Sequence, residues 1–335
     1  MKKNDYKNIA VMILGPLGDI INTSCVFSQL KKAYPLAEIS IIGSPAGLAA
    51  VKGIPEISGI YLYDRKKDKE ASSVKGLFKF AFSLRGKFDL MVVLDNTLRA
   101  GLISFLSGTP VRVGREGDLK KILLTDTIPY LKEEKEMQIP VTEHYMRCLK
   151  PLGLYEPNLE PHFVYGEQVK ESVLKIFEQY DLKGKKLLGF CPMSNAMKKS
   201  LRIEDAAQII DTVKGQTDYE IVILGGNDVS DYVNELEKKC SESFVNLVGK
   251  TSFTQSACVI DMCSKFISID TSQMHLAFAF KTPCVSIFFT DIFKKWGPRN
   301  FDINRLLVNQ ESKEMKCEEV LKNLNDLEDK IFPLN

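Results

Sequence analysis

Short, continuously apolar segments alternate with amphipathic segments along the whole chain. The first half contains five apolar segments of strand length, at 9–14, 39–43, 59–63, 90–94 and 111–113. The second half repeats this rhythm at 186–190, 220–224, 244–248, 265–269 and 284–288. Strands that are apolar at every position are buried on both faces, as in parallel sheets covered by helices. The pattern therefore predicts an α/β protein with two parallel sheets.

The segments between these strands show the periodicity of helices. The segment between the two halves separates two domains. Helices are predicted at 20–33, 73–84, 203–213, 229–239, 254–263, 273–280 and 315–329. Between the two halves, residues 155–185 contain two prolines, a charged helix and Gly184. We place the boundary there, which gives a domain at 1–165 and a domain at 166–335. The last helix is expected to be able to pack back on the first domain.

The composition is that of an ordinary globular protein, with 44% hydrophobic residues, 26% charged residues and a formal net charge of +2. A net charge this small does not attract the protein to nucleic acid. The basic run at 65–69 suits either a solvated loop or contact with an anionic membrane surface. The eight cysteines contain no Cys-x-x-Cys pair, so we interpret them as buried apolar side chains. Because no leader or spanning segment is recognisable, we expect a cytoplasmic protein, at most peripheral on a membrane.

The first strand leads into the glycine turn GPLG at 15–18, which departs from the dinucleotide fingerprint Gly-x-Gly-x-x-Gly. Asp19 follows directly, and its carboxylate would repel a bound phosphate. Asp19 is therefore either the N-cap of the following helix or a residue with a chemical role.

The second half offers a separate candidate site, at the start of the helix predicted at 273–280. Asp270 ends an apolar strand, and Thr271, Ser272 and Gln273 open the helix. Amide groups at such a start bind anions, whereas Asp270 suits the hydroxyl groups of a sugar. The alternative is that Asp270 or Thr271 only caps the helix.

Three loops after other strands of this half carry groups that suit a nucleotide diphosphate. Ser194 and Lys199 lie in a polar loop, and Asp228 follows a Gly-Gly turn where it can reach ribose hydroxyls. Gly249 is included in the nucleotide-binding set. Its surroundings do not form a P-loop, because Phe244 stands where the first P-loop glycine is required.

Taken in this order, the segments resemble glycosyltransferase family 9, the bacterial heptosyltransferases of the lipopolysaccharide inner core. The resemblance rests on Gly18-Asp19 with the helix ending LKKAYP, on HYMRCLKPLGL, on IDTSQMHLAFAFKTPCVSIF and on WGP. It implies two Rossmann-like domains facing across a cleft, the GT-B type. It also implies inverting transfer of a heptose from ADP-heptose to a lipopolysaccharide-core or related surface-glycan acceptor, at the cytoplasmic face of the inner membrane.

The resemblance also implies roles for individual residues. Asp19 matches the family's general base, beside Gly18 at the acceptor. Lys199 matches the lysine that contacts the donor phosphates, with Lys198 as the alternative register, and Ser194 matches a hydroxyl residue. Asp270 matches the carboxylate at the donor sugar. Further residues implied at the phosphates are Thr271, Ser272, Gln273 and His275, of which Ser272 replaces the family's glycine and His275 is expected either to brace the loop or only to pack.

An anionic acceptor requires cations in the first domain. The guanidinium group of arginine can bind a carboxylate or a phosphate through two parallel hydrogen bonds. Arg99, Arg112 and Arg115 are the candidates, because they are predicted past strand ends; surface arginines without a ligand are the alternative. The chain contains no Asp-x-Asp pair, so we expect no metal ion and no cofactor besides the donor substrate. Two other functions stay open: a sugar-nucleotide epimerase of the same fold, and a non-catalytic protein that binds nucleotide sugars.

Overall fold

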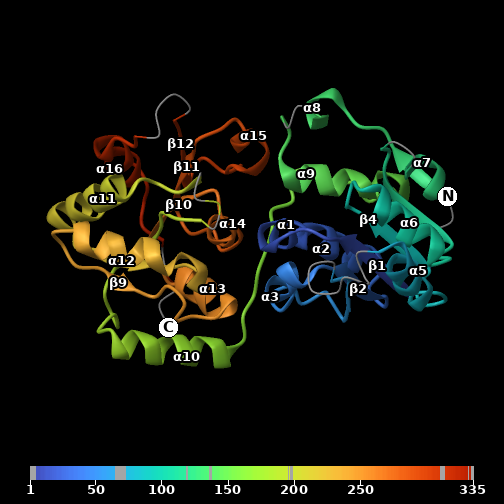
Figure 1. The fold of residues 1–335 in the computed structure, drawn as a ribbon, viewed down its shortest axis with the longest axis horizontal. Helices are drawn as coiled ribbons and strands as arrows, with labels where there is room; N and C mark the ends of the chain where they lie inside the picture. The colour runs from blue at the N-terminus through green and yellow to red at the C-terminus, as the bar shows by residue number, and fades with distance from the viewer. Residues whose placement is uncertain are drawn as a thin grey trace. The chain divides into compact units, whose positions relative to one another are not determined.

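The computed structural model describes residues 5–64, 73–117, 120–135, 138–194, 196, 199–309, 314–330 and 332. The chain forms two compact units, Met1–Val164 and Tyr165–Asn335 (Figure 1). The boundary predicted after residue 165 lies one residue from this division. The basic run at 65–69 lies outside the described residues.

The first unit contains a six-stranded parallel sheet in the order β3-β2-β1-β4-β5-β6. Its strands are β1 (Asn8–Ile13), β2 (Glu38–Gly43), β3 (Gly59–Leu62), β4 (Leu90–Val93), β5 (Val111–Arg115) and β6 (Asp126–Ile128). The strand order reverses between β1 and β4. Ligands of open α/β sheets bind at such a switch point, outside the carboxyl ends of the strands.

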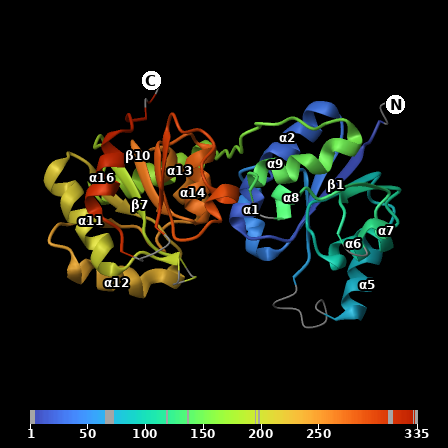
Figure 2. The same ribbon diagram turned by 90° about the horizontal axis from the view of Figure 1, so that it is seen from above.

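Helices cover both faces of this sheet (Figure 2). The helical elements are α1 (Leu17–Asn22), α2 (Ser24–Ala33), η1 (Pro45–Gly47), α3 (Leu48–Val51), α5 (Val74–Ser83), α6 (Leu98–Leu106), α7 (Lys120–Leu123), α8 (Lys132–Lys135), α9 (Val141–Met146) and η2 (Arg147–Leu152). Ala10 and Met12 of β1 pack in one buried cluster with Leu77 of α5 and Ala100 of α6. The continuous apolar sequence of β1 therefore reflects burial on both faces.

The second unit repeats the same architecture. Its parallel sheet has the order β12-β11-β10-β7-β8-β9, so the switch point lies between β7 and β10. The strands are β7 (Leu187–Cys191), β8 (Glu220–Ile223), β9 (Val245–Asn246), β10 (Lys265–Ile269), β11 (Cys284–Phe288) and β12 (Asn304–Val308). The helical elements are α10 (Glu167–Gln179), α11 (Ile203–Gln216), η4 (Asn227–Val229), α12 (Ser230–Lys239), α13 (Phe253–Asp261), α14 (Ser272–Ala279), α15 (Phe293–Trp296) and α16 (Cys317–Asn325). The prediction of two Rossmann-like α/β domains is confirmed.

The structure corrects one predicted helix and places another in a core. The helix predicted at 20–33 is two helices, α1 and α2, separated by Thr23. The hydroxyls of Thr23 and Ser24 donate to the carbonyls of Ile20 and Ile21, both over 2.7 Å, and such local bonds compete with a continuous helix. The last helix, α16, contributes Val320 and other buried residues to the core of the second unit, and the expectation that it can also pack on the first domain stays a prediction.

The burial of the cysteines and the lengths of the helices can be compared with the expectations of buried cysteines and of no membrane-spanning segment. Seven of the eight cysteines are buried and Cys240 is partly buried, as expected of small apolar side chains. Burial raises the pKa of the Cys284 thiol to about 12. Within the described ranges, every helix is too short or too polar to span a membrane.

Candidate active site

Asp19 lies at the switch point of the first unit, in the first turn of α1. The helix begins at Leu17, and Pro16 occupies the N-cap position without a side-chain cap. The interpretation of Asp19 as the N-cap is therefore wrong. Its Oδ1 instead accepts a hydrogen bond of 2.6 Å from the hydroxyl of Tyr145, a buried residue of α9. A carboxylate in the first turn also interacts favourably with the helix dipole.

The glycine turn is shaped by the Asp19 side chain. A Cβ atom on Gly15 would lie 2.3 Å from Oδ2 of Asp19 and 2.7 Å from its Cβ. Gly15 is therefore required to make room for this carboxylate. Gly18 lies in the first turn of α1, where its carbonyl accepts a 2.8 Å hydrogen bond from Asn22.

The three arginines predicted to bind the acceptor differ in their surroundings. Arg115 is fully buried and Arg112 is partly buried, and both lie within β5 instead of past its end. Arg112 donates to the carbonyls of Leu123 and Thr109, and burial lowers its pKa. Arg115 is inaccessible to an acceptor, so the expectation that it binds one is wrong. For the partly exposed Arg112 this expectation stays a prediction. Arg99 stays a candidate: it lies in the first turn of α6 and donates to the Tyr63 hydroxyl over 2.6 Å.

Lys199 and Asp270 form an ion pair at the switch point of the second unit. The Nζ of Lys199 lies 2.6 Å from Oδ2 of Asp270, and the two side chains are 45% and 12% exposed. Lys199 comes from the loop after β7, and Asp270 directly follows the neighbouring strand β10. The two residues that sequence analysis placed at the donor are thus brought together. Lys198, the alternative lysine, lies outside the described residues.

The start of α14 lies beside this ion pair. Thr271 occupies the N-cap position, but its hydroxyl makes no cap bond and instead lies 3.2 Å from the hydroxyl of Ser268. Asp270 is therefore not the N-cap residue, and Thr271 holds that position without a side-chain cap. The Ser272 hydroxyl donates to the side chain of Gln273 over 3.1 Å. The first amide groups of this helix have no side-chain cap, which is the arrangement that suits an anion.

The other residues of the predicted donor set lie in the same unit but have structural partners. The Ser194 hydroxyl accepts from the amide of Ala196 over 3.2 Å and thereby shapes the loop. Asp228 is exposed in η4, directly after β8 and the Gly-Gly turn. Gly249 has a φ of 69°, and a Cβ there would collide with the side chain of Asn227. Gly249 is therefore explained by its backbone conformation.

His275 lies in α14 below the helix start and is buried. Its ring packs edge-on against Trp296, with the ring centroids 5.7 Å apart, and against Phe278. Its Nδ1 is buried without a hydrogen-bond partner. Burial lowers the pKa of His275 to about 4, so the ring is neutral at neutral pH. These contacts support a packing role beneath the helix start.

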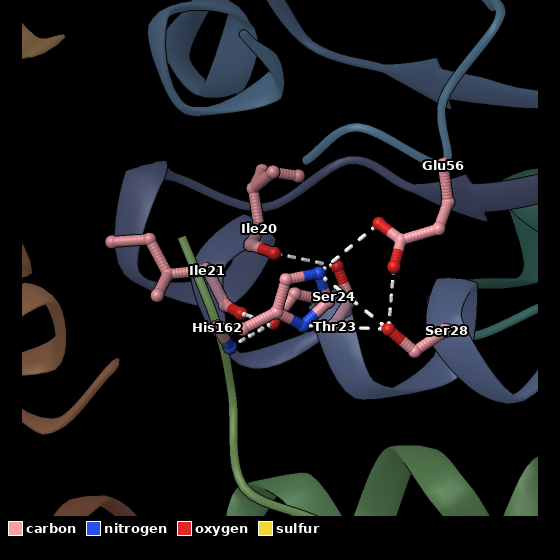
Figure 3. Close-up of polar contacts among 7 residues, drawn as sticks. All are labelled: Ile20, Ile21, Thr23, Ser24, Ser28, Glu56 and His162. Carbon is pink, nitrogen blue, oxygen red and sulfur yellow. Dashed lines mark hydrogen bonds and ion pairs between the residues drawn. The ribbon is translucent and has the colours of Figure 1, made fainter. Parts of the chain in front are cut away.

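Sequence analysis missed two groups in the first unit. The first is Tyr145, the partner of Asp19. The second is a polar cluster of Glu56, His162 and Ser28 (Figure 3). Nε2 of His162 lies 3.0 Å from Oε2 of Glu56, and the Ser28 hydroxyl donates to Oε1 over 2.6 Å. The amide of His162 also donates to the Ser24 hydroxyl, so the segment that ends the first unit is fastened to α2.

The residues present do not form an evident metal site. In the part of the chain that the structure describes, no group of three or more His, Cys, Asp and Glu side chains is placed to hold a metal ion.

Comparison with known proteins shows the family of the chain. Residues 77–325 match the family model of glycosyltransferase family 9 (heptosyltransferase). The chain belongs to this family. It is a glycosyltransferase, and neither the epimerase nor the non-catalytic alternative is favoured.

Individual relatives match nearly the whole chain. Lipopolysaccharide heptosyltransferase 3 of Escherichia coli is 25% identical over 290 residues, which cover 84% of this chain and 83% of that protein. A crystal structure of a family 9 glycosyltransferase from Veillonella parvula has a TM-score of 0.84 at 21% identity, covering 96% of this chain and 97% of that one. The ADP-heptose lipopolysaccharide heptosyltransferase II of E. coli has a TM-score of 0.76 at 22% identity, covering 95% and 97%.

Proposed function

We propose that the protein transfers a heptose, or a closely similar sugar, from ADP-heptose to a lipopolysaccharide-core or related surface-glycan acceptor with inversion. The Lys199–Asp270 ion pair at the switch point of the second unit carries the proposal, because it offers a cation to a diphosphate and a carboxylate to a sugar. The names of the E. coli relatives support this donor and this class of acceptor.

In this proposal the two units divide the substrates. Asp19 of the first unit acts as the general base that removes the proton of the acceptor hydroxyl. In the second unit, Lys199 and the amide groups that open α14 stabilise the charge that grows on the leaving diphosphate. Asp270 accepts hydrogen bonds from hydroxyl groups of the donor sugar and holds Lys199 in place. Arg99 is proposed to meet the anionic acceptor, and Asp228 the ribose.

We further propose that the reaction needs no divalent metal ion and no cofactor. A metal-dependent sugar transferase holds the diphosphate through a metal with hard oxygen ligands, whereas here Lys199 supplies the compensating charge. Turnover is expected to persist in excess chelator. Complete loss of turnover that one stoichiometric metal ion restores would contradict this proposal. The site of action is proposed to be the cytoplasmic face of the inner membrane, where the chain contacts the surface peripherally.

The experiment that tests the function is incubation with ADP-heptose, with and without a truncated lipopolysaccharide acceptor. We expect ADP release that depends on the acceptor, together with an acceptor heavier by one heptose. Conversion of the sugar without ADP release would instead identify an epimerase. Donor binding without either reaction would identify a protein that only binds nucleotide sugars.

A further inference from the structure

We propose that Tyr145 is a positioning residue that fixes the carboxylate of Asp19, and that Arg115 holds Tyr145 in place. The inference rests on the proposed role of Asp19 as the general base. The phenol approaches from α9, far along the chain from the glycine turn, and its oxygen lies 2.6 Å from Oδ1 of Asp19. A hydrogen bond to a charged acceptor is among the strongest that a protein makes.

Tyr145 acts only as a donor in this contact. Burial and the neighbouring charge of Asp19 raise the pKa of Tyr145 well above its usual value of 10. The phenol therefore keeps its proton throughout the working pH range. A buried donor of fixed protonation favours the charged form of the carboxylate, which is the form that a general base requires.

The Tyr145 hydroxyl holds one of the two oxygens of Asp19. Oδ1 accepts the hydrogen bond from Tyr145, whereas Gly15 leaves room for Oδ2, because a Cβ atom there would lie only 2.3 Å away. The hydrogen bond at Oδ1 favours this orientation of the carboxylate. Fixed orientation matters for a base, because misplacement of a reacting group by about 1 Å can cost 10²-fold in rate.

Arg115 connects the helix that carries Tyr145 to the sheet. Its guanidinium is fully buried and donates to the carbonyl of His144, the residue before Tyr145. It also donates to the carbonyl of Leu94 over 3.3 Å and to the side chain of Asn96 over 3.4 Å, both directly after β4. Because β4 neighbours β1, the base and its partner are anchored to the two strands of the switch point. A buried arginine at this place is thereby explained without an acceptor.

The test begins with Tyr145→Phe, which keeps the packed ring and removes the hydroxyl. We expect kcat to fall about 10-fold to 100-fold while the affinity for ADP is unchanged. The acid limb of the pH–rate profile should move to higher pH by about one unit, because the charged form of the base loses a donor. A tyrosine that merely supported the fold would leave the position of this limb unchanged.

Tyr155→Phe is the matched control. The Tyr155 hydroxyl also donates to a carboxylate of α9, Glu143, over 3.0 Å. Its removal is the same chemical change at a hydrogen bond to α9 that does not involve Asp19, and we expect kcat and the pH profile to stay those of the wild type. Site-specific 3-fluorotyrosine at position 145 retains the ring and strengthens the donor, so it should move the acid limb to lower pH. This second substitution keeps the test decisive if Tyr145→Phe folds poorly.

A double-mutant cycle with Asp19→Asn separates this inference from the proposed function. If Tyr145 acts through Asp19, the double variant should be no slower than Asp19→Asn alone. Loss of turnover in Asp19→Asn, together with wild-type kinetics and an unmoved acid limb in Tyr145→Phe, would overturn the inference about Tyr145 only. Wild-type turnover in Asp19→Asn would overturn the base and the positioning role together.

Discussion

The loops after β1 and β7 occupy equivalent places in two sheets of the same strand order, yet they are built from opposite chemistry. After β1, residues 14–16 form a tight turn that leads to a carboxylate held by a neutral phenol. After β7, the chain continues to α11 at Ile203, and Lys199 of this connection pairs with the carboxylate after β10. One topology thus provides two kinds of site. If the second switch point receives the phosphates, as proposed, local charge decides the choice between the two switch points more than strand order does.

The largest expected effect is that of Asp19→Asn on the first of these sites. Removing the base should lower kcat by roughly 10²-fold or more, since that is the usual contribution of a positioned general base. The affinity for ADP should hardly change, because the diphosphate is assigned to the other unit. Acceptor-dependent ADP release measures the first quantity and calorimetry the second. Wild-type kcat would remove Asp19 from the mechanism.

Lys199→Ala tests the second site and should be nearly as severe. We expect kcat/KM to fall by about 10²-fold, because the cation stabilises charge that grows in the transition state, and the affinity for ADP to fall as well. Lys183→Ala is a suitable control, since Lys183 pairs with Glu178 over 3.0 Å in an exposed ion pair of the same unit. If Lys198→Ala produced these losses and Lys199→Ala did not, the alternative register would be the correct one.

The comparison also shows which parts of the molecule the sequence could predict. Strands that are buried at every position, such as β7 and β10, or at every position but the first, such as β1, were predicted within one residue, because such burial leaves a nearly unbroken apolar signal. The strands β6 and β12 were not predicted, since polar residues interrupt both. The same alternation of strands and helices was enough to predict two Rossmann-like domains.

The candidate sites were predicted as single residues but not as contacts. Lys199 and Asp270 were each predicted, although their ion pair joins positions 71 residues apart. Tyr145 was missed because its partner Asp19 lies 126 residues away, and nothing local distinguishes its ring from other core aromatics. Arg115 was assigned to the acceptor because the sequence does not show that its strand end is buried. Long-range contacts and burial were thus the missing information.

His275 should make the stability of the second unit depend on pH. Burial lowers its pKa to about 4, whereas the unfolded chain has a histidine pKa near 6.5. The unfolded state therefore binds more protons between these values, and stability falls as the pH falls. At pH 5 this residue should cost about 2 kcal/mol of unfolding free energy relative to pH 8. Urea unfolding at both pH values measures the difference, and His275→Phe should reduce it by that amount. An unchanged pH dependence in His275→Phe would contradict the buried neutral ring.

The smallest expected effect concerns the cluster that fastens the end of the first unit to α2. Burial raises the pKa of Glu56, but hydrogen bonds from His162 and Ser28 outweigh it, and the net shift is downward. A carboxyl group with a lowered pKa in the folded state contributes stability above its unfolded pKa and loses it as the pH falls. Glu56→Gln should therefore lower the unfolding free energy by about 1 kcal/mol at pH 7, and the deficit should shrink as the pH approaches 4.

The control for this substitution is Glu178→Gln, which makes the same change in the exposed pair with Lys183 and should be nearly neutral. Hydrogen exchange in α2 locates the effect, because Ser28 lies in that helix and Ser24, its first residue, accepts the amide of His162. Faster exchange there, with kcat close to the wild-type value, would show that the first unit fastens its last segment independently of the Asp19 carboxylate. A loss of kcat as large as that of Tyr145→Phe would instead show that the cluster also supports Asp19, through the break between α1 and α2 at Thr23. The cluster would then not be independent of the proposed active site.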